Sequence, residues 1–170
     1  GTAGYRNDHF RLTGTIDATG TRGWWDFVEV VRGFRPIGGP AGSFGGSLDG
    51  AGNSVNGLFS AWSSPGMFGR TFDARISGVT LANVDIEHRF GPDAGGLVAL
   101  ADGEIGTTID NVRVSGTVAT PFGAGSDMDV GGIVGELRRG TLANGTSSAA
   151  VTVDVTGGYE SNVGGVAGRN

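Results

Sequence analysis

The most constraining feature of this chain is a repeat of 33 residues in its C-terminal two thirds. The six-residue stretches that begin at Ile76, Ile109 and Leu142 resemble one another, and their leading apolar residues lie 33 positions apart twice in succession. A second landmark keeps the same spacing, because Gly-Gly-Ile-Val-Gly at 131–135 recurs as Gly-Gly-Val-Ala-Gly at 164–168. Two independent landmarks with one period of this size indicate a solenoid.

An earlier copy of the second landmark, Gly-Gly-Leu-Val-Ala at 95–99, lies 36 residues before Gly131. We assign the three additional residues to a loop within 121–129. The run Gly-Met-Phe-Gly at 66–69 begins the repeat region at a comparable position. We therefore expect a single domain over 1–170, with a leading and capping segment at 1–65 and repeats at 66–170, as a fragment of a longer protein.

The apolar residues within each repeat follow an i, i+3, i+5 pattern, which a strand, a bend and a second strand produce. A unit of this kind cannot bury its own apolar face, so successive units must stack. Stacking would align Ile76, Ile109 and Leu142 in one internal ladder and Val79 with Val112 in another. Because crossovers between parallel strands are overwhelmingly right-handed, the predicted fold is all-β: a right-handed parallel β-helix with coils of about 33 residues. An antiparallel sandwich is the rival, but it would not require equal spacing.

Glycine is unusually abundant, with 35 of 170 residues. The paired glycines recur at one predicted corner, where two backbones would pass too closely for a side chain. The predicted corner glycines are Gly95, Gly96, Gly131, Gly132, Gly164 and Gly165.

The N-terminal segment is less regular. Residues 9–16 predict a strand, and Asp17–Gly20 predicts a turn. Apolar residues at 24, 27, 28 and 31 have helical spacing, although their β-branched and aromatic character also suits a strand. We expect a helical or irregular insert at Trp24–Val31 that covers one end of the stack.

Composition excludes several classes of function. The net charge is −5, all 12 basic residues are arginine, and cysteine is absent. An acidic chain without a basic stripe is unsuited to nucleic acid, and a chain without cysteine holds no thiolate metal site. No apolar stretch approaches the length of about 20 residues that a membrane helix needs, so we expect no membrane insertion of this segment.

Three segments resemble a known family. Phe-Arg-Leu-Thr-Gly-Thr-Ile-Asp at 10–17, Phe-Arg-Pro-Ile-Gly at 34–38 and the glycine-rich run at 44–58 are similar to the start of GLUG-motif repeat regions, and the double-glycine landmarks resemble the GLUG motif itself. Such repeats occur in bacterial surface adhesins and beside immunoglobulin-A-cleaving metallopeptidase domains. The resemblance implies a right-handed β-helix on an exported protein, and it implies no active site.

Zinc peptidase chemistry is not expected, because the two histidines, His9 and His88, are far apart in the sequence and no His-Glu-x-x-His motif is present. Calcium is a weaker alternative to having no cofactor. Asp127, Asp129 and Asp154 gather late in the chain, and calcium prefers oxygen ligands. In contrast, the aspartates at 17, 49 and 102 are better explained as turn formers.

Catalytic residues are not predicted, but a polysaccharide lyase or glycosidase is the alternative. Asp85, Glu87 and Arg89 alternate along one strand face, and Arg113 is expected on the next coil. Opposite charges on an exposed strand are more often a solvated face. The possible glycan contacts are Trp24, Trp25 and Trp62.

The sequence therefore predicts a structural or adhesive module of an exported bacterial surface protein, acting as a rigid spacer or presenting a surface to a host or neighbouring-cell ligand. Alternatives are a carbohydrate-active or glycan-binding module, and a solenoid that associates end to end through its last coil.

Overall fold

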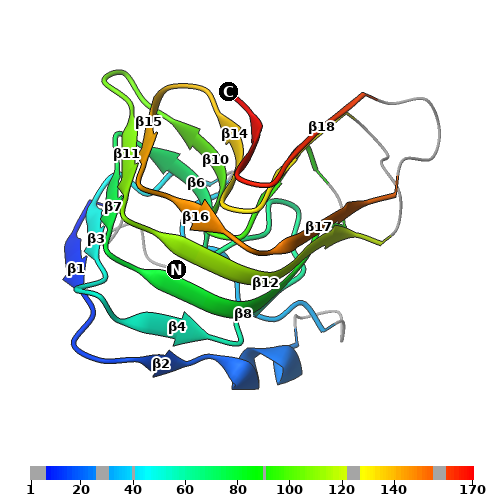
Figure 1. The fold of residues 1–170 in the computed structure, drawn as a ribbon, viewed down its shortest axis with the longest axis horizontal. Coiled ribbons are helices and arrows are strands. Elements are labelled where there is room, and N and C mark those ends of the chain that lie inside the picture. Colours follow the sequence, from blue (N-terminus) through cyan, green and yellow to red (C-terminus); the bar gives the residue numbers. More distant parts are fainter. Residues whose placement is uncertain (1–6, 26–30, 40, 90, 122–126, 155–159) are drawn as a thin grey trace.

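The computed structural model describes residues 7–25, 31–39, 41–89, 91–121, 127–154 and 160–170 (Figure 1). The fold of these residues is all-β, and each pairing between named strands is parallel. The strands form sheets of five, seven, three and four strands, which we call sheets 1 to 4. The predicted antiparallel sandwich is excluded by this pairing. In the described ranges, no helix is long and apolar enough to cross a membrane.

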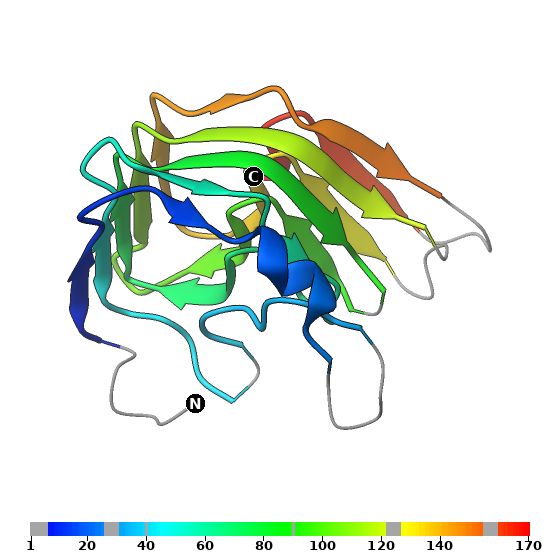
Figure 2. The same cartoon turned by 90° about the horizontal axis from the view of Figure 1, so that it is seen from below.

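Sheets 1 and 2 take up the first half of each repeat, and both are seen in Figures 1 and 2. Sheet 1 contains β1 (His9–Arg11), β3 (Ser47–Asp49), β7 (Arg75–Ser77), β11 (Thr107–Asp110) and β15 (Gly140–Ala143). Sheet 2 contains β2 (Ile16–Asp17), β4 (Ser54–Asn56), β8 (Thr80–Glu87), β12 (Arg113–Thr120) and β16 (Thr146–Ser147), with β5 (Phe59–Ser60) beside β8 and β17 (Ala150–Val153) beside β12.

Sheets 3 and 4 take up the second half of each repeat. Sheet 3 contains β9 (Asp93–Gly95), β13 (Met128–Gly131) and β18 (Ser161–Gly164). Sheet 4 contains β6 (Phe68–Phe72), β10 (Val98–Asp102), β14 (Val134–Leu137) and β19 (Ala167–Arg169). The chain thus passes through sheets 1, 2, 3 and 4 in order and then begins the next repeat beside the strand it left.

The register of sheet 1 places the repeat landmarks against one another. Ile109 is the partner of Ile76 on one side and of Leu142 on the other. The same row continues through Leu48 to Phe10. Ile76 and Ile109 are fully buried, whereas Phe10 is 44% exposed because it lies at the end of the row. Parallel in-register pairing therefore converts a sequence period into a column of apolar side chains.

A left-handed backbone position follows the end of each sheet 1 strand. Gly78, Asn111 and Asn144 have φ values of 62°, 49° and 49°. Glycine and asparagine tolerate this conformation better than other residues do. Val79 and Val112 come directly after the first two of these bends, and both are buried in the core.

The last repeat has smaller residues in the corresponding places. Gly145 follows the third bend, where a side-chain Cβ would lie 3.1 Å from Ile133 Cδ1. Ile133 therefore occupies space that a valine would need, and it compensates for the missing side chain.

The offset between paired residues changes along the repeat. It is 33 residues at Ile76 and Ile109, and 36 residues at Asp93 and Asp129. The change to the longer offset occurs between Ala119, which pairs with Glu87, and Asp129. This interval agrees with the predicted loop at 121–129, although residues 122–126 lie outside the described ranges.

The leading segment extends the same sheets, because β1 to β5 pair with one another or with strands of the repeats. The predicted insert at Trp24–Val31 falls partly on residues 26–30, which are not described. Its two ends are not helical, since Trp25 forms an antiparallel bridge with Val31. The short 3-10 helix, η2, lies earlier, at Thr19–Gly23, and Asp17 Oδ1 accepts a hydrogen bond from Thr19 N at 3.0 Å at its start.

Candidate functional site

Sheet 3 aligns two acidic residues from successive repeats. Asp93 of β9 is the direct partner of Asp129 of β13, and Asn162 of β18 is the next residue in this row. Asn162 Nδ2 donates a hydrogen bond of 2.7 Å to Asp129 Oδ1. Each of the three residues stands two positions before a double glycine, so the row is part of the repeat.

The double glycines form the sharp corner between sheets 3 and 4. A Cβ on Gly95 would collide with the Val98 carbonyl oxygen, and one on Gly131 would collide with the Val134 carbonyl oxygen. The first glycine of each pair thus permits a tight reversal within one repeat. In sheet 3, Gly131 is the register partner of both Gly95 and Gly164.

The second glycine of each pair serves contact between repeats. A Cβ on Gly96 would meet the Gly132 carbonyl oxygen, and one on Gly132 would meet the Gly165 carbonyl oxygen. A Cβ on Gly165 would meet no atom within 4 Å. The reason predicted from the sequence, close passage of two backbones, therefore applies to Gly96 and Gly132 rather than to all six glycines.

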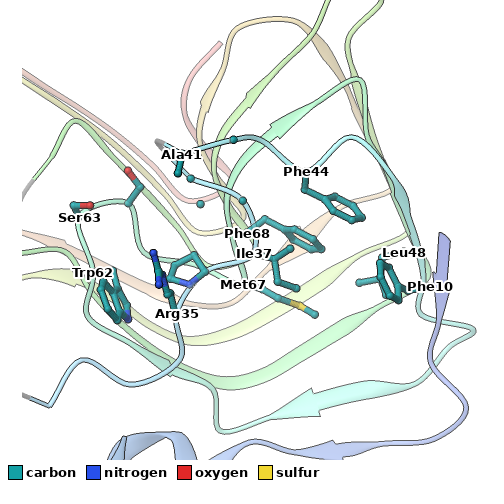
Figure 3. A pocket seen from close by; sticks show the side chains of 16 residues that line it. Phe10, Arg35, Ile37, Ala41, Phe44, Leu48, Trp62, Ser63, Met67 and Phe68 are labelled. Atoms are coloured by element: carbon teal, nitrogen blue, oxygen red, sulfur yellow. The ribbon is translucent and has the colours of Figure 1, made fainter. Parts of the chain in front are cut away.

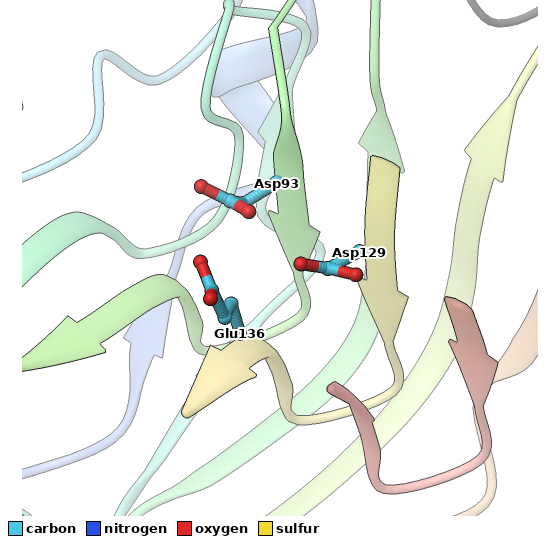
Figure 4. Close-up of side chains that lie close together, drawn as sticks. All are labelled: Asp93, Asp129 and Glu136. Atoms are coloured by element: carbon cyan, nitrogen blue, oxygen red, sulfur yellow. The ribbon is translucent and has the colours of Figure 1, made fainter. Parts of the chain in front are cut away.

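The corner brings a third carboxylate to the aligned aspartates. Glu136 lies on β14 in sheet 4, two residues after Val134. Carboxylate oxygens of Asp93, Asp129 and Glu136 all lie within 4.8 Å of one another, and Figure 4 shows the three side chains converging from β9, β13 and β14. Their exposed fractions are only 2%, 6% and 7%. We call these three residues the acidic cluster.

Arginines neutralise only part of the acidic cluster. Arg138 Nε lies 2.9 Å from Glu136 Oε2, and Arg169 Nη1 lies 3.9 Å from Asp129 Oδ2. Asp93 differs from the other two, because its Oδ1 is buried and has no hydrogen-bond partner. A buried polar atom without a partner costs free energy, so Asp93 Oδ1 is available to a ligand.

The electrostatics of the cluster raise the pKa of Asp93 to about 7. Burial is the largest cause, followed by the negative charges of Glu136 and Asp129, while Arg138 and Arg70 oppose the rise. The hydrogen bond to Glu136 raises the pKa of Arg138, so that this arginine stays charged. A carboxylate that holds its proton near neutral pH is one whose environment favours an added positive charge.

The structure unites only one of the three aspartates predicted to hold calcium with the acidic cluster. Asp127 Oδ1 instead accepts a hydrogen bond from Glu160 N at 3.0 Å, and Asp154 is exposed. Sequence reasoning missed Asp93 and Glu136. The pattern Asp-x-Gly-Gly, shared by residues 93–96 and 129–132, was the available signal for Asp93.

The aspartates expected to form turns make local hydrogen bonds. Asp49 Oδ1 accepts a hydrogen bond of 2.8 Å from Ala51 N, and Asp102 Oδ1 accepts one of 2.9 Å from Gly103 N.

The residues of the enzyme alternative do not form one site. Arg22 of η2 pairs with Asp85, and Arg89 Nη2 lies 2.9 Å from Glu87 Oε2. Arg113 pairs in register with Thr80, away from the position of Asp85 on β8. These charges hold the η2 segment and a strand end to the structure, and such ion pairs are ordinary on an exposed face.

The two histidines lie on different strands. His9 Nδ1 is 2.8 Å from Ser47 Oγ on the exposed end of sheet 1. His88 follows β8 and is buried, and burial lowers its pKa. They share no site in the structure.

The three tryptophans have different surroundings. Trp24 and Trp25 are 53% and 65% exposed. The guanidinium groups of Arg32 and Arg35 lie over the Trp62 ring, at 5.3 and 5.7 Å from its centre. Both arginines compete with any sugar ring that would stack on Trp62.

A largely apolar groove of about 730 Å³ lies beside Trp62 (Figure 3). Its floor contains Phe44 and Phe68, which are 1% exposed and have ring centres 5.0 Å apart. Phe10 lies at its open end. Large apolar grooves are common ligand sites, but this one brings together no pair of acidic side chains.

Comparison with known proteins gives one similarity. The chain is 32% identical over 156 residues to Halomucin of Haloquadratum walsbyi, and the match covers 86% of this chain but 2% of Halomucin. The chain thus corresponds to a small part of a very long relative. No protein-family model matches the chain, so its likeness to GLUG repeats stays a prediction. No solved structure matches it.

Proposed function

We propose that this chain is a rigid, right-handed β-helical module of an exported surface protein, which acts as a spacer or presents a lateral surface to a ligand. The observation that carries the proposal is the unbroken row from Phe10 through Ile76 and Ile109 to Leu142, formed by strands of successive repeats. Such a stack is stiff along its axis and offers a long side surface without any catalytic residue.

The relative supports a location outside the cell. Halomucin is named as a mucin, a class of extracellular proteins, and its great length relative to this chain suits a protein built from many modules. The acidic net charge of −5 and the absence of cysteine agree with a domain that folds without disulfides.

Surface labelling tests this proposal. Antibodies raised against the purified chain should stain intact cells of the source organism, and external protease should remove the staining. Staining that requires permeabilised cells would refute the surface role.

Glycan binding is the second candidate, and the exposed pair Trp24 and Trp25 favours it. Exposed aromatic rings provide flat apolar area for sugars. A panel of polysaccharides and glycans should then show binding that Trp24→Ala and Trp25→Ala weaken. Release of new reducing ends by the wild-type chain would instead establish the enzyme alternative.

End-to-end association is a further candidate for the same module. Strands β15, β18 and β19 each pair with one neighbour, so each has a backbone edge without a strand partner among the described residues. Val163 and Val166 are 48% and 40% exposed at this end. Sedimentation velocity at increasing concentration should show oligomers, and a strict monomer would exclude association by this fragment.

A further inference from the structure

We propose that the acidic cluster of Asp93, Asp129 and Glu136 is a calcium site that joins two successive repeats at the glycine corner. The proposal goes beyond the spacer role, because a module can act as a spacer with or without a bound ion. Its starting point is the convergence of three carboxylates that are more than nine-tenths buried.

The unpartnered oxygen of Asp93 is the second observation. Asp93 Oδ1 is buried, lacks a hydrogen-bond partner, and belongs to a side chain that is 2% exposed and points toward Glu136 and Asp129 (Figure 4). Arginines contact the other two carboxylates but not this one in the described residues. A carboxylate in such a place requires either a proton or a cation.

The chemistry of the donors selects a hard divalent cation. The three side chains offer oxygen only, and the described residues place no histidine among them. Carboxylate oxygen is the preferred ligand of calcium and magnesium, whereas zinc and copper favour nitrogen and sulfur.

The spacing of the donors favours calcium over magnesium. Ligands on opposite sides of a calcium ion, each at about 2.4 Å, are separated by about 4.8 Å, while a magnesium ion at about 2.1 Å allows only about 4.2 Å. The observed limit of 4.8 Å between the donor oxygens therefore suits calcium without movement of the strands.

The oxygens needed for binding are not all committed elsewhere. Glu136 Oε2 contacts Arg138, and Asp129 Oδ1 accepts the hydrogen bond from Asn162. Asp129 Oδ2 is only loosely engaged, with Arg169 at 3.9 Å. A bound ion would thus replace a weak ion pair and supply the partner that Asp93 Oδ1 lacks.

Binding would link β9 and β13, which are adjacent strands of sheet 3, to β14 of sheet 4. These strands come from two repeats and meet at the corner made by the double glycines. A ligand that binds only the folded chain raises its stability, so calcium should stiffen this corner against unfolding.

The test uses the purified 170-residue chain after removal of metals with a chelator and dialysis. Titration calorimetry with calcium chloride should show one ion per chain, with a dissociation constant of about 0.1–1 mM as in extracellular calcium modules. The thermal midpoint should rise with calcium and return to its starting value after addition of chelator.

Variants separate this site from general ionic effects. Asp93→Asn and Glu136→Gln should abolish both the calorimetric signal and the rise in midpoint. Asp154→Asn, which removes an exposed carboxylate outside the acidic cluster, should keep both. Glu136→Gln provides the answer if Asp93→Asn does not fold.

Three results would overturn the proposal. These are the absence of calcium binding by the wild-type chain up to about 10 mM, which is above the range of extracellular sites, retention of binding in both cluster variants, and an equal response to magnesium. None of them would affect the surface-labelling test, so the calcium site and the proposed function can fail separately.

Discussion

Asp93 should make the metal-free protein less stable as the pH rises from about 4 to about 7. Its pKa is 3.8 in the absence of structure and about 7 in the folded chain. Between these values the folded chain binds a proton that the unfolded chain has lost, so the free energy of unfolding falls as pH increases. The difference of about three pH units corresponds to about 4 kcal/mol, at about 1.4 kcal/mol for each unit.

Urea denaturation in the presence of a chelator measures this effect. The free energy of unfolding of the wild-type chain and of Asp93→Asn should be determined at a series of pH values from 4 to 8. The wild-type chain should lose stability relative to the variant by up to about 4 kcal/mol across this range. Asparagine carries no ionisable group, so its own contribution stays constant.

His88 must be separated from this effect because it acts with the opposite sign. Burial lowers its pKa, so the stability that depends on neutral His88 is present above pH 6.5 and is lost as the pH falls. Both proteins contain His88, and the difference between them removes its contribution. Equal pH dependence of the wild-type chain and Asp93→Asn would refute the raised pKa and the electrostatic account of the cluster.

Four further changes test the stack itself. Ile109→Ala should lower the free energy of unfolding by roughly 2–5 kcal/mol in urea denaturation, because it leaves a cavity in the middle of the apolar row. Gly132→Ala should cost about 2 kcal/mol or more through collision with the next repeat, while Gly165→Ala, with no neighbour within 4 Å, should leave the unfolding midpoint unchanged. Asn111→Ala should cost about 1 kcal/mol because of its positive φ, and Asn111→Gly should cost less; equal losses would contradict the strain argument. Deletion of residues 107–139 joins Gly106 to Gly140 in the register position of Thr107 and should retain a β circular dichroism spectrum and cooperative melting, whereas deletion of 107–131 should not fold.

The sequence by itself determined the row of apolar residues in sheet 1. Parallel in-register strands copy the sequence period into space, so a spacing of 33 residues was sufficient to predict that Ile76, Ile109 and Leu142 are neighbours. The close approach at Gly96 and Gly132 was predictable for the same reason, because the recurrence of paired glycines marks a place without room for side chains.

The fate of the leading segment depended on tertiary contacts. The apolar spacing at 24–31 suggested a helix, but Trp25 and Val31 bridge each other in the structure. The short helix forms at η2 instead, where Phe59 N donates a hydrogen bond to Thr21 Oγ1 and Arg22 pairs with Asp85. Local propensity is a weak guide where distant strands provide such partners.

Only the tertiary structure assembled the acidic cluster. The alignment of Asp93 with Asp129 follows from the repeat, but Glu136 belongs to another sheet and reaches them because the Gly131 corner turns the chain sharply between β13 and β14. Asp127 and Asp154, although close to Asp129 in the sequence or equally acidic, lie elsewhere. A period in the sequence specifies which residues stack along the axis, whereas the angle at each corner decides which side chains from different sheets meet.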